Sequence, residues 1–349
     1  MPAMLVCRHP GWLERHLGQL IAFLKCRGLV AAIGVMTVWS HVVLAQQPMP
    51  IIGFLGNASP NEYEIRLRAF REGLKAIGFV EGQNVAIEYK WAGGDTSRLQ
   101  TLANELVNRQ VAVLVAGGGT PTALASKAVT ATIPIVFAVS ADPVELGLVP
   151  NSNRPGGNLT GISNLNVQMG PKRLELVREL LPGSTQVAVL LNPDHPDAGN
   201  SFLRGLEPVA KAMEFQLHIF RASKDDELDL AFSQIADQKM DALLIAPDVF
   251  FVTRSEQLAK ISLRHAVPTI YTYRPFVAAG GLMTYSSDEV EYYRLVGTYA
   301  GRILKGDKPG DLPVHQSIKV ELIINLKTAK ALGITVPLSL LGRADEVIE

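Results

Sequence analysis

The sequence predicts an α/β protein built from two Rossmann-like, doubly wound lobes, and three observations lead to this fold class. Short apolar segments such as IIGFL (51–55) alternate along the chain with segments whose apolar residues recur at helical spacing. The 349 residues suffice for two domains of ordinary size, and 48% of them are hydrophobic. The third observation is an internal repeat. Together these features predict parallel sheets with helices on both faces.

The internal repeat consists of three blocks that recur in the same order in the two halves of the chain. Two similar lobes that face one another would form a cleft, and doubly wound sheets bind their ligands beyond the carboxyl ends of the strands. The alternative is chance resemblance among α/β sequences. The paired blocks are 76–79 (AIGF) with 212–215 (AMEF), 113–117 (VLVAG) with 243–247 (LLIAP), and 133–137 (IPIVF) with 267–271 (VPTIY).

The elements of the first half follow from apolar spacing and from capping residues. Gly78 ends the first helix, and Asp95 or Thr96 caps the second. The expected order is strand 51–55, helix 65–77, strand 85–89, helix 96–108, strand 111–116, helix 120–130 and strand 133–139.

The second half repeats this alternation after a change of composition. The stretch 150–163 is rich in Asn, Pro and Gly and suggests a crossing between lobes, with a second at 280–285. Three crossings would make lobe 1 residues 46–160 plus 286–313 and lobe 2 residues 161–285 plus 314–349. The expected elements of this second half of the chain include helix 172–181, strand 186–191, helix 252–266, helix 289–304, strand 318–324 and helix 326–332.

The first 45 residues have the pattern of a secretory signal peptide. A basic leader precedes the uncharged apolar run 28–45, which ends in small residues that suit cleavage after Ala45. An uncleaved membrane anchor is the alternative. Cys7 and Cys26 both lie in this leader, so the mature chain would contain no disulfide. We therefore expect a periplasmic protein.

The glycine-rich turn after strand 111–116 is the most distinctive short motif. Gly117–Gly119 are followed by Thr120, a suitable helix N-cap, and Pro121, which suits the first helical position. The free N–H groups of such a helix start favour an anion. A tight strand-to-helix turn is the alternative, and without a third glycine the motif is a weak nucleotide fingerprint.

Several chemistries are not supported by the sequence. It contains no His-Glu-x-x-His, no Gly-x-Ser-x-Gly, no P-loop lysine and no Cys-x-x-Cys. No histidines show metal-ligand spacing. The formal net charge is zero, and no basic run is interleaved with aromatic residues, so a nucleic-acid partner is not expected. We expect a binding protein without catalytic residues, metal or cofactor.

Polar recognition groups instead gather where the expected strands end. An acid on one wall and helix-terminal amides on the other suit a zwitterion, with aromatic residues holding its apolar side chain. Asp248 has the alternative of an ordinary helix N-cap, and one of Phe250 and Phe251 should lie in the core. The candidates are Asn57, Ser59, Gly119, Thr120, Ser140 and Asp142 from lobe 1, and Asn192, Asn200, Asp248, Phe250, Phe251, Tyr271 and Tyr273 from lobe 2.

Five longer stretches carry a family resemblance that covers residues 51–349. These stretches are AFREGL (69–74), VEGQNVAIEY (80–89), RPGGNLTG (154–161), KRLEL (172–176) and INLKTAKALG (324–333). The chain thereby resembles the tryptophan-binding-like solute-binding proteins of ABC transporters. The resemblance implies a periplasmic-binding-protein fold of the first type, whose two lobes close on a small ligand.

Position by position, the resemblance adds Gly118, Thr122 and Ser163 to the candidate ligand-binding residues. The sequence departs from common relatives at Asn57–Ala58, where serines are frequent. The implied function is capture of a small zwitterion, such as an aromatic or branched amino acid, and its delivery to an ABC permease with ATPase subunits. We expect a monomer. The alternatives are a membrane-anchored sensory domain and an unrecognised doubly wound enzyme.

Overall fold

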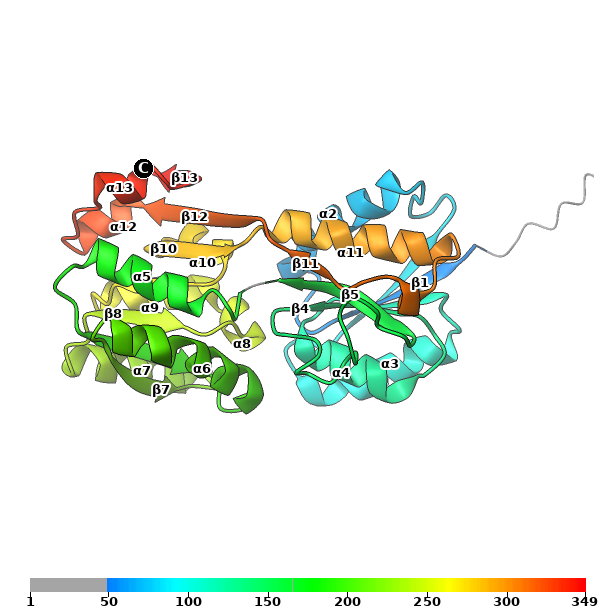
Figure 1. Cartoon of the computed structure of the whole chain (residues 1–349), viewed down its shortest axis with the longest axis horizontal. Coiled ribbons are helices and arrows are strands. Elements are labelled where there is room, and N and C mark those ends of the chain that lie inside the picture. The colour runs from blue at the N-terminus through cyan, green and yellow to red at the C-terminus, as the bar shows by residue number, and fades with distance from the viewer. Residues whose placement is uncertain (1–48, 165) are drawn as a thin grey trace, which may run out of the picture. The chain divides into compact units, whose positions relative to one another are not determined.

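Two sheets organise the chain, and each has helices on both faces (Figure 1). The structure is a computed structural model that describes residues 49–164 and 166–349. Residues Pro50–Glu349 form one unit of tertiary contacts that contains both sheets. The predicted signal peptide, residues 1–45, lies outside the described residues. Within the described part of the chain, no helix is both long and apolar enough to cross a membrane.

Lobe 1 is the first sheet with its helices. Its strand order is β11-β5-β4-β3-β1-β2, and every neighbouring pair is parallel. Side chains alternate along each strand, so Phe54 packs on the helices of one face and Leu55 on those of the other. The elements are β1 (Ile51–Gly56), α2 (Glu64–Ala76), β2 (Ala86–Trp91), α3 (Leu99–Asn108), β3 (Val113–Ala116), α4 (Thr120–Val129), β4 (Ile135–Val139), β5 (Leu159–Asn164), α11 (Glu289–Leu304) and β11 (His315–Ser317), with short 3₁₀ turns at Asn61–Tyr63, Thr96–Arg98 and Pro309–Asp311.

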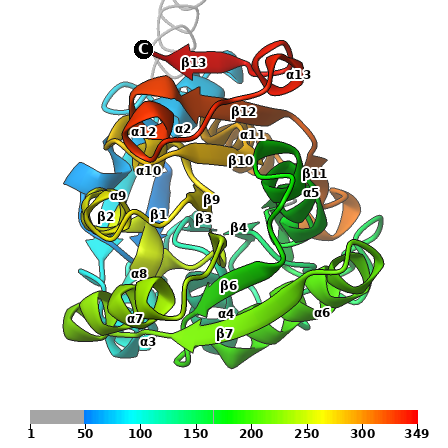
Figure 2. The same ribbon diagram turned by 90° about the vertical axis from the view of Figure 1, so that its left-hand side faces the viewer.

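Lobe 2 is the second sheet with its helices. Its strand order is β13-β12-β10-β9-β8-β6-β7. Figure 2 shows the molecule with this lobe toward the viewer. All pairs are parallel except β10 with β12. The elements are α5 (Gly170–Leu180), β6 (Gln186–Leu191), α6 (Pro196–Ala212), β7 (Gln216–Arg221), α7 (Asp225–Asp237), β8 (Ala242–Ile245), α8 (Val249–Val252), α9 (Ser255–Arg264), β9 (Thr269–Tyr271), α10 (Arg274–Ala278), β10 (Met283–Ser287), β12 (Val320–Asn325), α12 (Leu326–Ala331), α13 (Leu338–Leu341) and β13 (Glu346–Ile348).

The strand orders confirm the internal repeat. The series β2, β1, β3, β4, β5 in lobe 1 corresponds in position to β7, β6, β8, β9, β10 in lobe 2. The repeated blocks fall on the ends of α2 and α6, on β3 and β8, and on β4 and β9. Two copies of one supersecondary plan therefore form the two lobes.

The crossings between the sheets lie a few residues from the expected boundaries. Because β5 belongs to the lobe 1 sheet and β10 to the lobe 2 sheet, the chain crosses after Asn164 and after Ser287, rather than at 160 and 285. The third crossing follows Ser317. The polar segment LTGISN is a buried strand because its polar groups are paired: the Thr160 hydroxyl donates to the Leu312 carbonyl at 2.7 Å.

The two helices on one face of lobe 1, α2 and α11, touch through their backbones (Figure 1). A Cβ atom on Gly73 would lie 1.9 Å from the Arg294 carbonyl oxygen, and one on Gly297 would lie 2.0 Å from the Phe70 carbonyl oxygen. Only glycine permits this approach at either position. The contact fixes the relative position of the side chains at the N-terminal ends of both helices.

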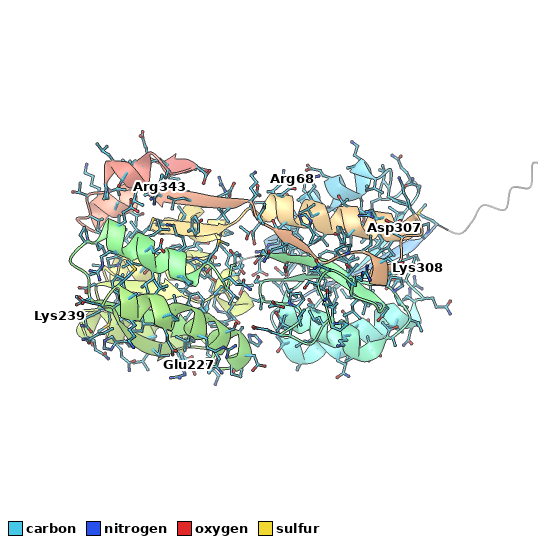
Figure 3. All side chains as sticks on the ribbon, in the orientation of Figure 1. Arg68, Glu227, Lys239, Asp307, Lys308 and Arg343 are labelled. Carbon is cyan, nitrogen blue, oxygen red and sulfur yellow. The ribbon has the colours of Figure 1, made fainter. Side chains whose placement is uncertain are left out.

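Charged side chains of both signs cover the outer surfaces of the two lobes. Figure 3 labels Arg68 and Lys308 on lobe 1 and Lys239 and Arg343 on lobe 2, all pointing outward and exposed. Arg68 is two positions from the buried Arg66 on α2, and therefore lies on the opposite face of that helix.

Candidate functional site

Three neighbouring cavities lie where the carboxyl ends of the strands of both lobes meet. The larger cavity, about 630 Å³, is lined by Asn57 and Ser59 from lobe 1 and by Asn192 and Phe250 from lobe 2. The apolar cavity, about 430 Å³, is lined mostly by apolar surface from Pro121, Leu124, Leu146, Val167, Pro247 and Val249, and its lining also includes Asp194, His195, Asp197 and Asp248. The inner cavity, about 50 Å³, lies beside the crossings and is lined by Arg66, Gly118, Gly119, Ser140, Asn164, Val249, Tyr273 and Glu289, among others.

The glycine-rich turn supplies the lobe 1 wall of the apolar and inner cavities. Gly119 has φ of 84° and is the N-cap position of α4, so helix and turn meet in a backbone conformation that suits glycine. The buried Thr122 hydroxyl accepts from the Gly118 N–H at 3.0 Å and donates to the Gly119 carbonyl at 2.8 Å. Thr122 therefore holds the turn in shape, while Thr120 lines the apolar cavity.

The lobe 2 wall centres on Asp248, whose carboxylate accepts three hydrogen bonds. Oδ1 accepts from Asn192 Nδ2 at 2.9 Å and from the Phe250 N–H at 2.8 Å, and Oδ2 lies 2.6 Å from His195 Nδ1. The hydrogen bond to Asp248 raises the pKa of His195, although partial burial opposes this shift. Asp248 is the N-cap of α8, as the alternative reading of the sequence expects. The same carboxylate also contacts His195, which lines the larger and apolar cavities.

The inner cavity contains a buried ion pair. Arg66 Nη2 donates to Glu289 Oε1 at 2.8 Å, and the two side chains are 10% and 16% exposed. The Arg66 guanidinium lies 4.9 Å from the centre of the Tyr63 ring. Burial alone lowers the pKa of Arg66, but the neighbouring Glu289 carboxylate raises it, and the net shift is well upward. The guanidinium therefore stays charged.

The aromatic candidates separate into core and cavity residues. Phe251 is fully buried in the lobe 2 core, whereas Phe250 lines the larger cavity with the Arg254 guanidinium carbon 3.9 Å from its ring centre. Tyr271 is also fully buried, and its hydroxyl has no hydrogen-bond partner among the described residues. Tyr273 lines the apolar and inner cavities, and its hydroxyl lies 3.5 Å from that of Ser140 across the cleft.

Most of the candidate residues named from the sequence come together around these cavities. Asn57 is 2% exposed, and its Oδ1 lacks a partner in the described part of the chain. Six candidates do not line the three cavities. Thr122 holds the glycine-rich turn, Asp142 caps the following turn through the Val144 N–H, and Ser163 is buried within β5. Asn200 is exposed on α6, and Phe251 and Tyr271 are core residues. The candidates that line a cavity are Asn57, Ser59, Gly118, Gly119, Thr120, Ser140, Asn192, Asp248, Phe250 and Tyr273.

Sequence reasoning did not place His195, Arg66 or Glu289 at the cavities, which they line. His195 follows β6 in the same loop as Asn192, so its position after a strand was a usable signal. Arg66 and Glu289 lie 223 positions apart on two helices, and no local pattern joins them. Among the residues that the structure describes, no cluster of His, Cys, Asp and Glu is arranged to hold a metal ion.

Comparison with known proteins identifies the family. The family described as ABC transporter substrate binding protein matches residues 59–348. The chain belongs to this family. Its homologues are solute-binding proteins and not enzymes. Substrate-binding proteins of this class are found outside the cytoplasm, where they bind small molecules and interact with transporter subunits.

The relatives of this substrate-binding protein include proteins whose names or structures record a bound amino acid. A curated tyrosine-binding protein from Clostridioides difficile is 29% identical over 76% of this chain and 75% of its own length. A Streptococcus pneumonia ABC domain solved in complex with L-Trp has 25% identity and a TM-score of 0.78, covering 86% of this chain and 99% of its own. A conserved domain protein from Vibrio cholerae has 29% identity and a TM-score of 0.80 over the same shares. These likenesses confirm the two-lobe fold.

Proposed function

We propose that this substrate-binding protein captures an α-amino acid with an aromatic or branched side chain between its lobes and delivers it to an ABC permease. The apolar cavity carries the proposal. Its volume of about 430 Å³ lies within the range of about 300–1,000 Å³ for small-molecule sites, and its mostly apolar lining suits an apolar side chain. Relatives that bind tyrosine and tryptophan support the same ligand class.

The mechanism is a population shift rather than catalysis. A ligand that touches the glycine-rich turn and Ser140 on lobe 1 and Val249 and Tyr273 on lobe 2 makes both sets of contacts only when the lobes are close. The ligand therefore stabilises the closed form by its differential affinity for that form. The permease would recognise this closed form, and its ATPase subunits would drive transport.

The site residues proposed here are the candidates that line the cavities. Asp248 is a weaker ammonium partner than the sequence suggested, because three donors already occupy its carboxylate.

We propose export to the periplasm with cleavage after Ala45, and a monomeric receptor. Membrane retention of the full chain would instead favour a sensory domain, and turnover of a bound compound would favour an enzyme.

A thermal-shift screen of refolded, ligand-free protein against the amino acids tests the proposal. A ligand present at 100 times its Kd should stabilise the protein by about 2.7 kcal/mol, which is a readily measured rise in Tm. We expect the largest rise with an aromatic or branched amino acid. No rise with any amino acid would refute the ligand class.

A further inference from the structure

The buried pair of Arg66 and Glu289 has more hydrogen-bonding capacity than lobe 1 uses. Arg66 carries five N–H donors, and among the described residues only Nη2 has an acceptor. Glu289 Oε2 receives no hydrogen bond there. A buried ion pair offsets its desolvation only when its remaining donors and acceptors find partners. None of these groups is among the fully enclosed polar atoms that lack a partner in the described residues, so they are accessible to a polar partner such as water or a ligand.

These unused groups belong to a cavity that both lobes enclose. Gly118, Gly119 and Ser140 line it from lobe 1, and Val249 and Tyr273 from lobe 2. Its volume of about 50 Å³ accommodates about four water-sized groups, which is comparable to an α-carboxylate with its α-ammonium. Gly119, Ser140, Val249 and Tyr273 also line the apolar cavity, so a group held here can extend its side chain there.

We infer that Arg66 and Glu289 together recognise the zwitterionic head group of the ligand. The guanidinium binds the α-carboxylate, beside the N-terminus of α4, and the Glu289 carboxylate binds the α-ammonium. The four charges then alternate around a ring, and each buried charge has an opposite neighbour. Ligands that carry only one of the two charges leave a buried group without a partner, and are rejected for that reason.

A purely structural role for the pair, joining α2 to α11, explains less. The backbone contact at Gly73 and Gly297 already holds these helices together. The Arg294–Glu291 pair on α11 is more exposed and lines none of the three cavities described above, so it serves as a comparison. A helix-joining pair also predicts no discrimination among ligands that differ by one charge.

The inference rests on the proposed function, and ligand analogues separate the two. Calorimetry is performed with L-tyrosine and L-tryptophan, with their 3-arylpropionates, which lack the ammonium, and with their arylethylamines, which lack the carboxylate. The wild type should bind an amino acid and discriminate against both analogues. If the wild type binds none of these compounds, the proposed ligand class fails. If it binds an amino acid but the variants below keep its discrimination, only the head-group inference fails.

Glu289→Gln is the main variant, with Glu64→Gln at an exposed position of α2 as its matched control. Loss of a charged hydrogen bond should weaken amino-acid binding about 10–100-fold and leave arylpropionate binding within about threefold. Arg66→Lys keeps the buried positive charge and should weaken the amino acid and the arylpropionate alike, while Arg68→Lys on the outer face changes neither. If Arg66→Lys does not fold, the ratio of amino-acid to arylpropionate affinity in Glu289→Gln decides: an unchanged ratio overturns the inference.

Discussion

Replacing Gly73 by alanine should separate α2 from α11 and destabilise lobe 1. The added Cβ would lie 1.9 Å from the Arg294 carbonyl oxygen, whereas a carbon–oxygen contact needs about 3.3 Å, so the helices must part by about 1.4 Å. Overpacking of this kind costs about 1–3 kcal/mol. Alanine recovers about 1 kcal/mol through its helix propensity, which leaves a net loss of up to about 2 kcal/mol. At about 2–4 °C per kcal/mol, Tm should fall by up to about 8 °C.

The matched control is Gly205→Ala in the interior of α6. There the nearest atom to an added Cβ is Pro171 Cδ at 3.9 Å, an ordinary contact. The same substitution should therefore stabilise the protein by up to about 1 kcal/mol. Urea unfolding followed by circular dichroism measures both variants. If Gly73→Ala raised stability as Gly205→Ala does, the helix contact described here would be wrong.

Three further substitutions test the cleft. Because Asp248 raises the pKa of His195, their ionic hydrogen bond stabilises the fold fully below about pH 6.5, and this stabilisation is lost as pH rises through the raised pKa. The difference in Tm between the wild type and His195→Gln should therefore narrow from about pH 5.5 to about pH 9, and a constant difference would contradict this. Thr122→Val removes two hydrogen bonds of the glycine-rich turn and should lower the free energy of unfolding in urea by about 1–3 kcal/mol. An unchanged urea midpoint would show that the turn does not depend on the Thr122 hydroxyl. Tyr271→Phe removes a hydroxyl that has no hydrogen-bond partner in the described residues, so stability and the amino-acid affinity measured by calorimetry should both be preserved. A loss of affinity would identify Tyr271 as a ligand contact.

The fold could be predicted because its signals are local and repeated. The strand 186–191 and the helix 289–304 have the bounds expected from apolar spacing, since each is an apolar or amphipathic run between clear breakers. The strand β5 was not foreseen, because LTGISN is polar and follows an Asn, Pro and Gly loop. Its burial depends on partners from distant segments, such as the Leu312 carbonyl, which no local pattern reveals.

The candidate site could be predicted only as far as strand ends define it. Residues after β1, β3, β4, β6 and β8 reach the cavities because carboxyl ends of parallel strands share one edge of a sheet. Side-chain roles depend on three-dimensional partners: Asp248 was correctly foreseen as a possible N-cap, but its pairing with His195 was not. Arg66 and Glu289 sit on helices whose approach requires glycine on both, a feature that apolar periodicity does not report.

Both members of the Arg66–Glu289 pair belong to lobe 1, and this has a kinetic consequence. If the pair binds the head group as proposed, an open receptor would present both charged partners on lobe 1 before lobe 2 closes, so the association rate should depend on lobe 1 and its charges. Release requires lobe 2 to withdraw Val249 and Tyr273, so the dissociation rate should depend on that wall. Substitutions in lobe 2 can then lengthen or shorten the residence time of the ligand while the speed of its capture stays the same.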